Sequence, residues 1–405
     1  MSEKRRNRIL LPVALTWSVL VLGTVEWTVG SGSCRPFLAL ADPRVGPAGF
    51  GALVTHAILC DSDRRKRIVL RLGVLLEILR IFFLLRRGIS AEVVAFSTGY
   101  GFFAAALADF LIHREWRAAA LAALVPIGMA SAPLGLAGIV RKHTPLTYDG
   151  ALVAFDATLR IPFTEWSAAL LERVAAIRAL TLIAYAALPG AIAAGLAYEE
   201  YTIRKGTTRG VGVNLLLAYT ISGTLAAILY MICPGTGPYH AFPGLFPAHL
   251  PDALHVPLVL TPFAPDSPRN AMPSLHVAWA VMLARSTAGA RKSVRIAAWS
   301  YAIFTIVATI GSGEHYVFDL IATAPFLIAL EAATARRIIA PRRRVIVFIV
   351  GLLIYSAWIA AIRNAPAVIP ALASNPVVVW ILVLATLGIS AVLALRHGQA
   401  VRSLT

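Results

Sequence analysis

The chain has little charge and little cysteine. Only 14% of its 405 residues are charged, whereas 58% are hydrophobic. The three cysteines, Cys34, Cys60 and Cys233, show no metal-ligand spacing, and their odd number supports no disulfide framework. Acidic side chains are scarce as well, because 20 of them stand against 37 lysines and arginines, which leaves a net charge of +17.

An excess of basic residues is often a sign of nucleic-acid binding. Here the basic residues form short clusters between long apolar segments, which is the arrangement that anchors a membrane protein. The sequence therefore argues against nucleic acid as a partner and favours membrane lipids.

The apolar segments predict the fold class. Several of them reach the roughly 17–25 residues that a spanning helix needs. Such segments are helical in lipid, because each backbone polar group needs a partner within the chain. We predict an all-α polytopic membrane protein with about 12 spanning helices. The predicted spans are 8–30, 42–60, 68–85, 89–112, 118–140, 177–197, 211–233, 272–288, 294–312, 315–334, 345–363 and 376–395.

The first two predicted spans differ from ordinary spanning helices. Basic residues precede the first span, 8–30, which is longer than the apolar core of a cleaved signal and predicts an uncleaved signal anchor. The second span, 42–60, contains Gly46, Pro47, Gly49 and Gly51 and is either a span or a re-entrant segment.

The positive-inside rule predicts the orientation. Twelve spans place both termini and the five densest basic clusters in the cytoplasm. The clusters are Lys4–Arg8, Arg64–Arg67, Arg204–Arg209, Arg291–Arg295 and Arg336–Arg344. The 234–271 loop, with a single basic residue, then lies outside. The abundance of arginine over lysine and of alanine indicates a GC-rich bacterial source, so we expect the bacterial plasma membrane.

Charged residues within the third and fourth spans are costly in lipid. Antiparallel packing of these two spans brings Arg71 near Asp109. Either the two spans form an ion-paired helix hairpin or their charges line a substrate path.

The 143–176 segment lies between spans. Its apolar spacing predicts short amphipathic helices lying on the outer membrane surface, and a structured loop is the alternative. Asp149 and Asp156 are seven residues apart and share a helix face. They either bind the hydroxyl groups of a polyol or form a solvated face.

The most informative segment is GEHYVFD at 313–319. His315 and Asp319 are four residues apart, so a helix places them one turn apart on one face. A carboxylate beside an imidazole fixes its tautomer and stabilises the imidazolium form. The pair therefore suits a histidine nucleophile.

The second informative segment is RNAMPSLH at 269–276. Pro273 suits the first turn of a helix, whose free N–H groups favour an anion. Ser274 adds a hydroxyl donor, and Arg269 offers a planar fork to a phosphate. His276 lies within a turn of this site and can donate a proton.

The two segments together predict phosphoryl transfer through a covalent phosphohistidine on the extracytoplasmic face. His315 attacks phosphorus, His276 protonates the leaving oxygen, and Arg269 and Ser274 hold the phosphate oxygens. We expect no metal and no cofactor in this reaction.

PSLH followed by GxHYxxD resembles the phosphatidic acid phosphatase type 2 superfamily. It is more closely similar to the inositol phosphorylceramide synthase branch, an aureobasidin-sensitive synthase-like group. The resemblance covers about residues 143–334 and implies a six-helix core with a metal-independent mechanism. It implies that His315 is the nucleophile, Asp319 its partner and His276 the acid, with Ser274 matching the serine of the second motif.

The resemblance also divides the chain into three parts. Residues 1–142 form an N-terminal accessory transmembrane bundle, 143–334 the catalytic core and 335–405 a C-terminal transmembrane hairpin.

The chain departs from the wider superfamily at two places. Ala308 and Thr309 replace a Ser-Arg pair, so one phosphate-binding arginine is missing, and Arg269 is a candidate to compensate. The first superfamily motif is replaced by PGTGPYHAFP at Pro234–Pro243. Tyr239 and His240 in this segment either contact a head group or acceptor or belong to a plain loop.

Two outcomes follow from a phosphohistidine. An alcohol that attacks it makes the protein a transferase, which moves a phosphorylated head group, such as phosphoinositol, from a phospholipid donor to a lipid, polyprenyl or glycan acceptor. Water makes it a lipid phosphatase acting on phosphatidate or polyprenyl phosphate. A non-enzymatic transporter or scaffold is the third interpretation, and the lack of a repeat of two six-span halves counts against a transporter.

Overall fold

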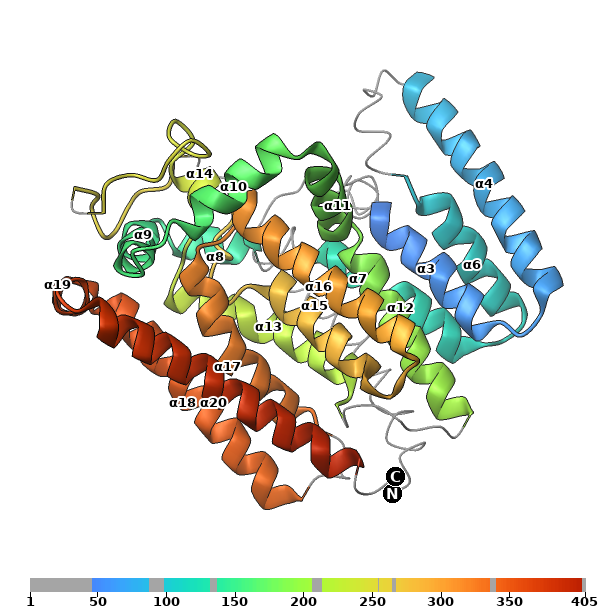
Figure 1. Cartoon of the computed structure of the whole chain (residues 1–405). Coiled ribbons are helices and arrows are strands. Elements are labelled where there is room, and N and C mark those ends of the chain that lie inside the picture. The colour runs from blue at the N-terminus through green and yellow to red at the C-terminus, as the bar shows by residue number, and fades with distance from the viewer. Residues whose placement is uncertain are drawn as a thin grey trace. The chain divides into compact units, whose positions relative to one another are not determined.

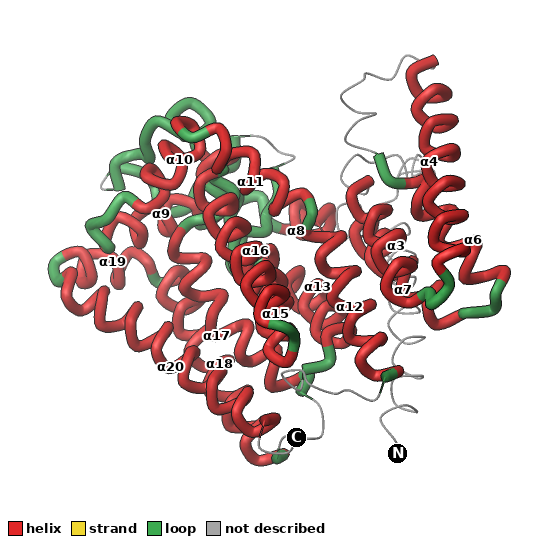
Figure 2. Tube along the Cα trace, turned by 45° about the vertical axis from the view of Figure 1, so that its right-hand side comes forward, coloured by secondary structure: helices red, strands yellow, loops and turns green. Residues whose placement is uncertain are grey.

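The structure is a computed structural model that describes residues 46–86, 98–131, 137–205, 213–253, 255–263, 267–335 and 340–402. Its elements are helices, and no strand occurs in this part of the chain apart from two isolated bridges, Thr147–Leu260 and Val213–Ala335 (Figure 2). The all-α prediction is confirmed for the described residues. The helices form two compact units.

Unit 1 contains the described residues up to Gly138 together with α12. Inside it α3 packs against α6, α7 and α12, and α4 packs along α6 (Figure 1). Two buried carboxylates stabilise this packing. Glu77 of α4 accepts a hydrogen bond from the backbone N–H of Gly101 at 2.6 Å. Glu200 of α12 forms an ion pair with Arg117 of α7 at 2.6 Å. The helices are α3 (Gly46–Leu59), α4 (Asp63–Arg86), α6 (Tyr100–Ile112), α7 (Trp116–Ser131) and α12 (Leu188–Arg204).

The predicted ion-paired hairpin is present, with a different arginine. Asp109 near the end of α6 pairs with Arg65 at the start of α4 at 2.7 Å and with His56 of α3 at 2.8 Å. Arg71 lies further along α4 and is exposed, so its predicted pairing with Asp109 is wrong. The ligand atoms of His56, Cys60 and Asp109 lie within 4.8 Å of one another. Arg65 holds the same Asp109 oxygen that His56 reaches, and we interpret this group as an ion-paired cluster that joins three helices.

Unit 2 contains Ile139–Tyr185 and the chain from Ala218 onward. Its central helix is α17, which is buried along most of its length and packs against α9, α15, α18 and α20. α15 in turn packs against α16, and α16 packs against α10 (Figure 1). The helices of unit 2 are α8 (Ala137–His143), α9 (Asp149–Thr158), α10 (Phe163–Arg173), α11 (Ala175–Ala186), α13 (Leu215–Ile232), α14 (Pro238–Ala241), α15 (Leu275–Ser286), η2 (Thr287–Gly289), α16 (Lys292–Gly311), α17 (Val317–Ala333), α18 (Pro341–Arg363), α19 (Ala365–Ala373) and α20 (Pro376–Arg402).

Four described helices are long and apolar enough to cross a membrane, namely α13, α16, α18 and residues Pro376–Leu395 of α20. The number rises to five if α11 and α12 are one broken span. Large apolar side chains on α18 and α20 are exposed, for example Leu353 at 63% and Leu384 at 62%, as a lipid-facing surface requires. These helices indicate an integral membrane protein.

The count of twelve spans and the six-helix core stay predictions. Several predicted spans correspond to shorter helices, such as α3, α6, α15 and α17, and the predicted span 8–30 lies outside the described residues.

The 143–176 segment differs from its prediction. It forms α9 and α10, but α9 is buried on nearly all sides instead of lying on a membrane surface. α10 is one-sided, because Ala168 is buried while Trp166 is 61% exposed. Asp149 and Asp156 are both buried, so the solvated-face interpretation of these two carboxylates is wrong.

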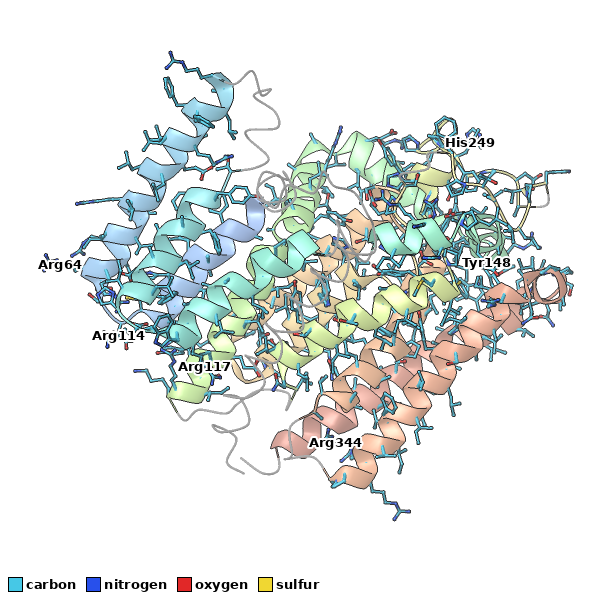
Figure 3. All side chains as sticks on the ribbon, turned by 180° about the vertical axis from the view of Figure 1, so that it is seen from behind. Arg64, Arg114, Arg117, Tyr148, His249 and Arg344 are labelled. Atoms are coloured by element: carbon cyan, nitrogen blue, oxygen red, sulfur yellow. The ribbon has the colours of Figure 1, made fainter. Side chains whose placement is uncertain are left out.

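The two ends of unit 2 differ in the segments that they carry. In Figure 3 the basic side chain of Arg344 lies at one end, whereas Tyr148 and His249 lie at the other. The 234–253 loop and α9 therefore lie away from the start of α18 (Figure 1).

Candidate active site

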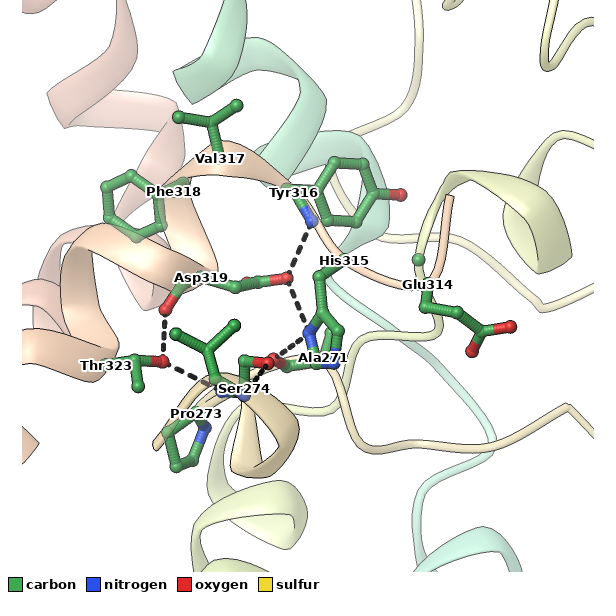
Figure 4. A network of polar contacts seen from close by, with 12 residues as sticks. Ala271, Pro273, Ser274, Glu314, His315, Tyr316, Val317, Phe318, Asp319 and Thr323 are labelled. Carbon is green, nitrogen blue, oxygen red and sulfur yellow. Dashed lines mark hydrogen bonds and ion pairs between the residues drawn. The ribbon is translucent and has the colours of Figure 1, made fainter. Parts of the chain in front are cut away.

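The two histidine motifs meet at the first turns of α15 and α17 (Figure 4). The backbone N–H of Ser274 donates a hydrogen bond to Oγ1 of Thr323 at 2.9 Å, and that hydroxyl donates to the carbonyl oxygen of Asp319 at 2.6 Å. A second link joins His315 to Ala271, 44 residues earlier in the chain. The structure thus brings together the residues that the sequence placed in two separate segments.

The tautomer of His315 follows from its partner. Its Nδ1 atom lies 2.7 Å from the carbonyl oxygen of Ala271. A carbonyl oxygen only accepts, so Nδ1 carries the proton and the lone pair of the neutral ring is on Nε2. The Nε2 atom is the one that can attack an electrophile.

Asp319 has a different position from the one expected. Its Oδ2 accepts a hydrogen bond from the backbone N–H of Tyr316 at 2.9 Å and lies 3.5 Å from Nδ1 of His315. Its other oxygen, Oδ1, is buried with no hydrogen-bond partner among the described residues. The carbonyl of Ala271 therefore orients the ring, while Asp319 supplies a negative charge beside it.

Ser274 caps α15. Its hydroxyl oxygen accepts a hydrogen bond from the backbone N–H of Val277 at 3.4 Å, and the residue is fully buried. The free N–H groups of this first turn point toward the N-terminal end of the helix, where an anion is favoured.

His276 lies under an aromatic ring that sequence reasoning missed. The ring of Tyr185 on α11 stacks on its imidazole with 4.2 Å between centroids and an interplanar angle of 11°. Tyr185 falls inside a predicted span without a motif, so nothing in the sequence singled it out.

Glu314 lies beside both histidines. Burial raises the pKa of its carboxyl, but the polar contact with His240 and the interactions with His315 and His276 outweigh this and lower the pKa below its ordinary value. The distance from Oε2 of Glu314 to Nε2 of His240 is 3.7 Å. The sequence offered a signal for Glu314, since it stands inside the GEHYVFD motif.

The 234–243 loop packs against the residues just before His315, and a glycine lies on each side of this contact. Gly237 has φ 86° and Gly313 has φ 74°, a region that side chains rarely allow. The backbone N–H of Tyr239 donates to the carbonyl oxygen of Gly313 at 2.9 Å. Of the two residues predicted to contact substrate, the Tyr239 side chain is 56% exposed, and that of His240 meets Glu314.

Asp149 accepts hydrogen bonds from the backbone of this loop. Its Oδ1 accepts hydrogen bonds from the backbone N–H groups of Thr236 and Gly237 at 2.9 and 3.0 Å and from the Tyr316 hydroxyl at 2.9 Å. Burial raises the pKa of this carboxyl, and the hydrogen bonds oppose that effect. Asp149 thus joins α9, the loop and the residue after His315.

Asp156 holds the start of α17. Its two oxygens accept hydrogen bonds from the backbone N–H groups of Val317 and Phe318, both at 2.9 Å. These are N–H groups that a helix leaves free at its N-terminus. Burial raises the pKa of Asp156 to about 8. Both acidic residues of α9 are thereby bonded to neighbouring segments, and their binding of a polyol stays a prediction.

Arg269 is 4% exposed and donates hydrogen bonds to two carbonyl oxygens, those of Thr144 and Ser267. These bonds fix the guanidinium near the start of α15. Its contact with a phosphate stays a prediction, as do the catalytic roles of His315, His276 and Asp319.

Comparison with known proteins gives one result. A family model described as the PAP2 superfamily matches residues 150–333, which include both histidine motifs. This match suggests phosphatase or phosphotransferase activity and does not distinguish the synthase-like branch. No curated protein and no solved structure matches the chain.

Proposed function

We propose that the protein is a membrane phosphotransferase that moves a phosphorylated polar head group from a lipid donor to a lipid or glycan alcohol through a phosphohistidine. The observation that carries the proposal is the hydrogen bond from Nδ1 of His315 to the carbonyl of Ala271 at 2.7 Å. This bond leaves the Nε2 lone pair for attack, inside a region that matches the PAP2 superfamily.

The first step forms a bond between Nε2 of His315 and phosphorus and breaks the bond from phosphorus to the lipid oxygen. His276 gives its proton to that oxygen, so the lipid alcohol leaves. General acid catalysis of this kind typically contributes about 10²–10⁴ in rate.

The second step reverses the roles. The oxygen of the acceptor alcohol attacks phosphorus, the phosphorus–nitrogen bond breaks, and the acceptor proton passes to His276. Asp319, 3.5 Å from Nδ1, stabilises the positive charge that His315 carries while it is phosphorylated. Ser274 and the N-terminus of α15, with Arg269 nearby, hold the phosphate oxygens.

The proposed site faces the extracytoplasmic side of a bacterial plasma membrane. Support comes from Arg344, which lies at the opposite end of unit 2 from Tyr148 and His249 (Figure 3). The positive-inside rule assigns the arginine end to the cytoplasm.

If water attacks the phosphohistidine in place of the alcohol, the same site is that of a lipid phosphatase. A transporter or scaffold would convert no phospholipid at all. Purified protein incubated with isotopically labelled phosphatidic acid and phosphatidylinositol, with and without added alcohols and with a chelator present, separates these cases by mass spectrometry. We expect a new phosphodiester from phosphatidylinositol and a new phosphomonoester of the added alcohol from phosphatidic acid. Free phosphate or a free phosphorylated head group as the sole product identifies a phosphatase, and absence of product contradicts both enzyme functions.

Matched histidine variants complete this test. His315→Ala and His276→Ala are expected to abolish or strongly lower turnover. The control is His255→Ala, because the His255 side chain is 81% exposed and lies outside the site. Retained activity in His315→Ala overturns the nucleophile assignment.

A further inference from the structure

Glu314 and His240 form a polar pair beside the proposed nucleophile that the chemistry above does not use. The side chain of Glu314 is 26% exposed and that of His240 is 25% exposed, whereas His315 is 1% exposed. Solvent therefore reaches the pair more easily than the nucleophile, and the pair lies on the accessible side of the site.

Backbone contacts hold the pair in place. Glu314 is the residue directly before His315, and the carbonyl of Gly313 accepts the N–H of Tyr239, next to His240, at 2.9 Å. A Cβ atom on Gly237 would come within 2.3 Å of the Glu314 carbonyl oxygen, so the loop lies directly on the Glu314 backbone. The pair is thus fixed relative to the reacting nitrogen.

The chemistry of the pair selects its ligand. An ionised carboxylate accepts hydrogen bonds and repels phosphate oxygens, while an imidazole nitrogen can donate one. The lowered pKa of Glu314 keeps the carboxylate ionised, so it only accepts hydrogen bonds. A hydroxyl fits the pair, because it is neutral and can donate a hydrogen bond to the carboxylate while it accepts one from the imidazole.

We propose that Glu314 and His240 bind a hydroxyl of a polyol acceptor and thereby direct a second hydroxyl of the same molecule to the phosphorus on His315. This proposal rests on the transferase function above and names its acceptor class. The attacking oxygen forms the new bond to phosphorus, the bond to His315 breaks, and the attacking hydroxyl gives its proton to His276. Glu314 and His240 position the acceptor and form no covalent bond.

The test measures how one intermediate divides between two acceptors. Detergent-solubilised protein is incubated with labelled phosphatidic acid or phosphatidylinositol in the presence of glycerol or of 1-propanol, and the ratio of alcohol product to water product is measured. Loss of folded protein lowers both products together, so the ratio reports acceptor binding. Glycerol carries the extra hydroxyls that the pair binds, and 1-propanol does not.

We expect the wild type to favour glycerol over 1-propanol. Glu314→Gln and His240→Ala should lower the glycerol-to-water ratio by about tenfold, the effect of losing roughly 1.4 kcal/mol of acceptor binding, and leave the 1-propanol ratio nearly unchanged. Glu172→Gln, the same substitution at an exposed site on α10, should leave both ratios unchanged.

Three results overturn the proposal. The first is a glycerol-to-water product ratio that is the same in Glu314→Gln and in the wild type. The second is a 1-propanol-to-water product ratio that Glu314→Gln lowers as much as it lowers the glycerol ratio. The third is a wild type that consumes donor but makes only the water product, which leaves the phosphohistidine chemistry standing. Absence of any donor consumption is a failure of the proposed function itself and is thereby distinguishable.

Discussion

The ring of Tyr185 lies parallel to the imidazole of His276, with centroids 4.2 Å apart and 11° between the planes. Stacking of this kind covers one face of the imidazole and limits its rotation. The proposed acid is therefore oriented by a residue of α11, about 90 positions earlier in the chain.

Replacing Tyr185 tests this orientation. Tyr185→Ala removes the stacked ring and should lower kcat by roughly 10- to 100-fold, because a small misplacement of a catalytic group is costly. Tyr185→Phe keeps the ring and should retain most of the activity. Turnover of the two variants across pH 5–9 checks the prediction, and an active Tyr185→Ala with a wild-type pH profile contradicts it.

Asp149 should stabilise the fold through the hydrogen bonds that its oxygen accepts more than through its charge. Asp149→Ala leaves two backbone N–H groups and the Tyr316 hydroxyl without their acceptor. Each buried group left unsatisfied costs about 1–3 kcal/mol, so the variant should unfold at a clearly lower temperature. Asp149→Asn keeps the accepting oxygen and should have a much smaller effect. Thermal unfolding in detergent compares them, and equal losses in the two variants contradict the network.

Gly313 should not tolerate a side chain. Its φ of 74° disfavours one, and an added Cβ would come within 2.6 Å of the Phe246 ring and 2.9 Å of the Tyr239 nitrogen. Gly313→Ala should therefore displace the 234–243 loop and lower activity. The matched control is Gly244→Ala, since a Cβ at Gly244 meets nothing within 4 Å. Activity of both variants is measured, and equal activities contradict the prediction.

Asp156 should make stability depend on pH. Burial raises its pKa in the folded protein to about 8, whereas an unfolded aspartate titrates near 3.9. Between these values the folded state holds a proton that the unfolded state has lost, so stability falls as pH rises and levels off above about 8. Asp156→Asn cannot titrate. The unfolding temperature of the wild type should therefore fall relative to that of Asp156→Asn between pH 5 and pH 8, and a constant difference contradicts the raised pKa.

The sequence predicted the helical class, and it placed the starts of α15 and α17 within three residues of where they lie. Apolar length reports helices in lipid directly. Ser274 caps α15 and accepts a hydrogen bond there, whereas the sequence predicted its hydroxyl as a donor to an anion. His315 and Asp319 lie close together as predicted, with 3.5 Å between Nδ1 and Oδ2. They do not share a helix face, because His315 precedes Tyr316, the residue that caps α17.

Other features depend on contacts that local sequence does not encode. The orienting partner of His315 is a backbone carbonyl, and every residue has one, so Ala271 had no signal. Asp149 and Asp156 share a helix face as predicted, but only the packing of α17 and the 234–243 loop over α9 decides that this face is buried. The pairing of Asp109 with Arg65 in place of Arg71 depends on the register in which α4 and α6 pack, which local sequence does not encode.

The most direct test of the central claim is the position of the phosphoryl group on the trapped enzyme. Protein quenched in alkali after brief incubation with labelled donor is digested, and the phosphohistidine isomer is identified by mass spectrometry and chromatography against standards. Since the carbonyl of Ala271 holds Nδ1 at 2.7 Å, we predict phosphorylation of His315 at Nε2. A phosphoryl group on Nδ1 of His315, on His276 or on any other residue, or turnover with no phosphoenzyme at all, would contradict the account.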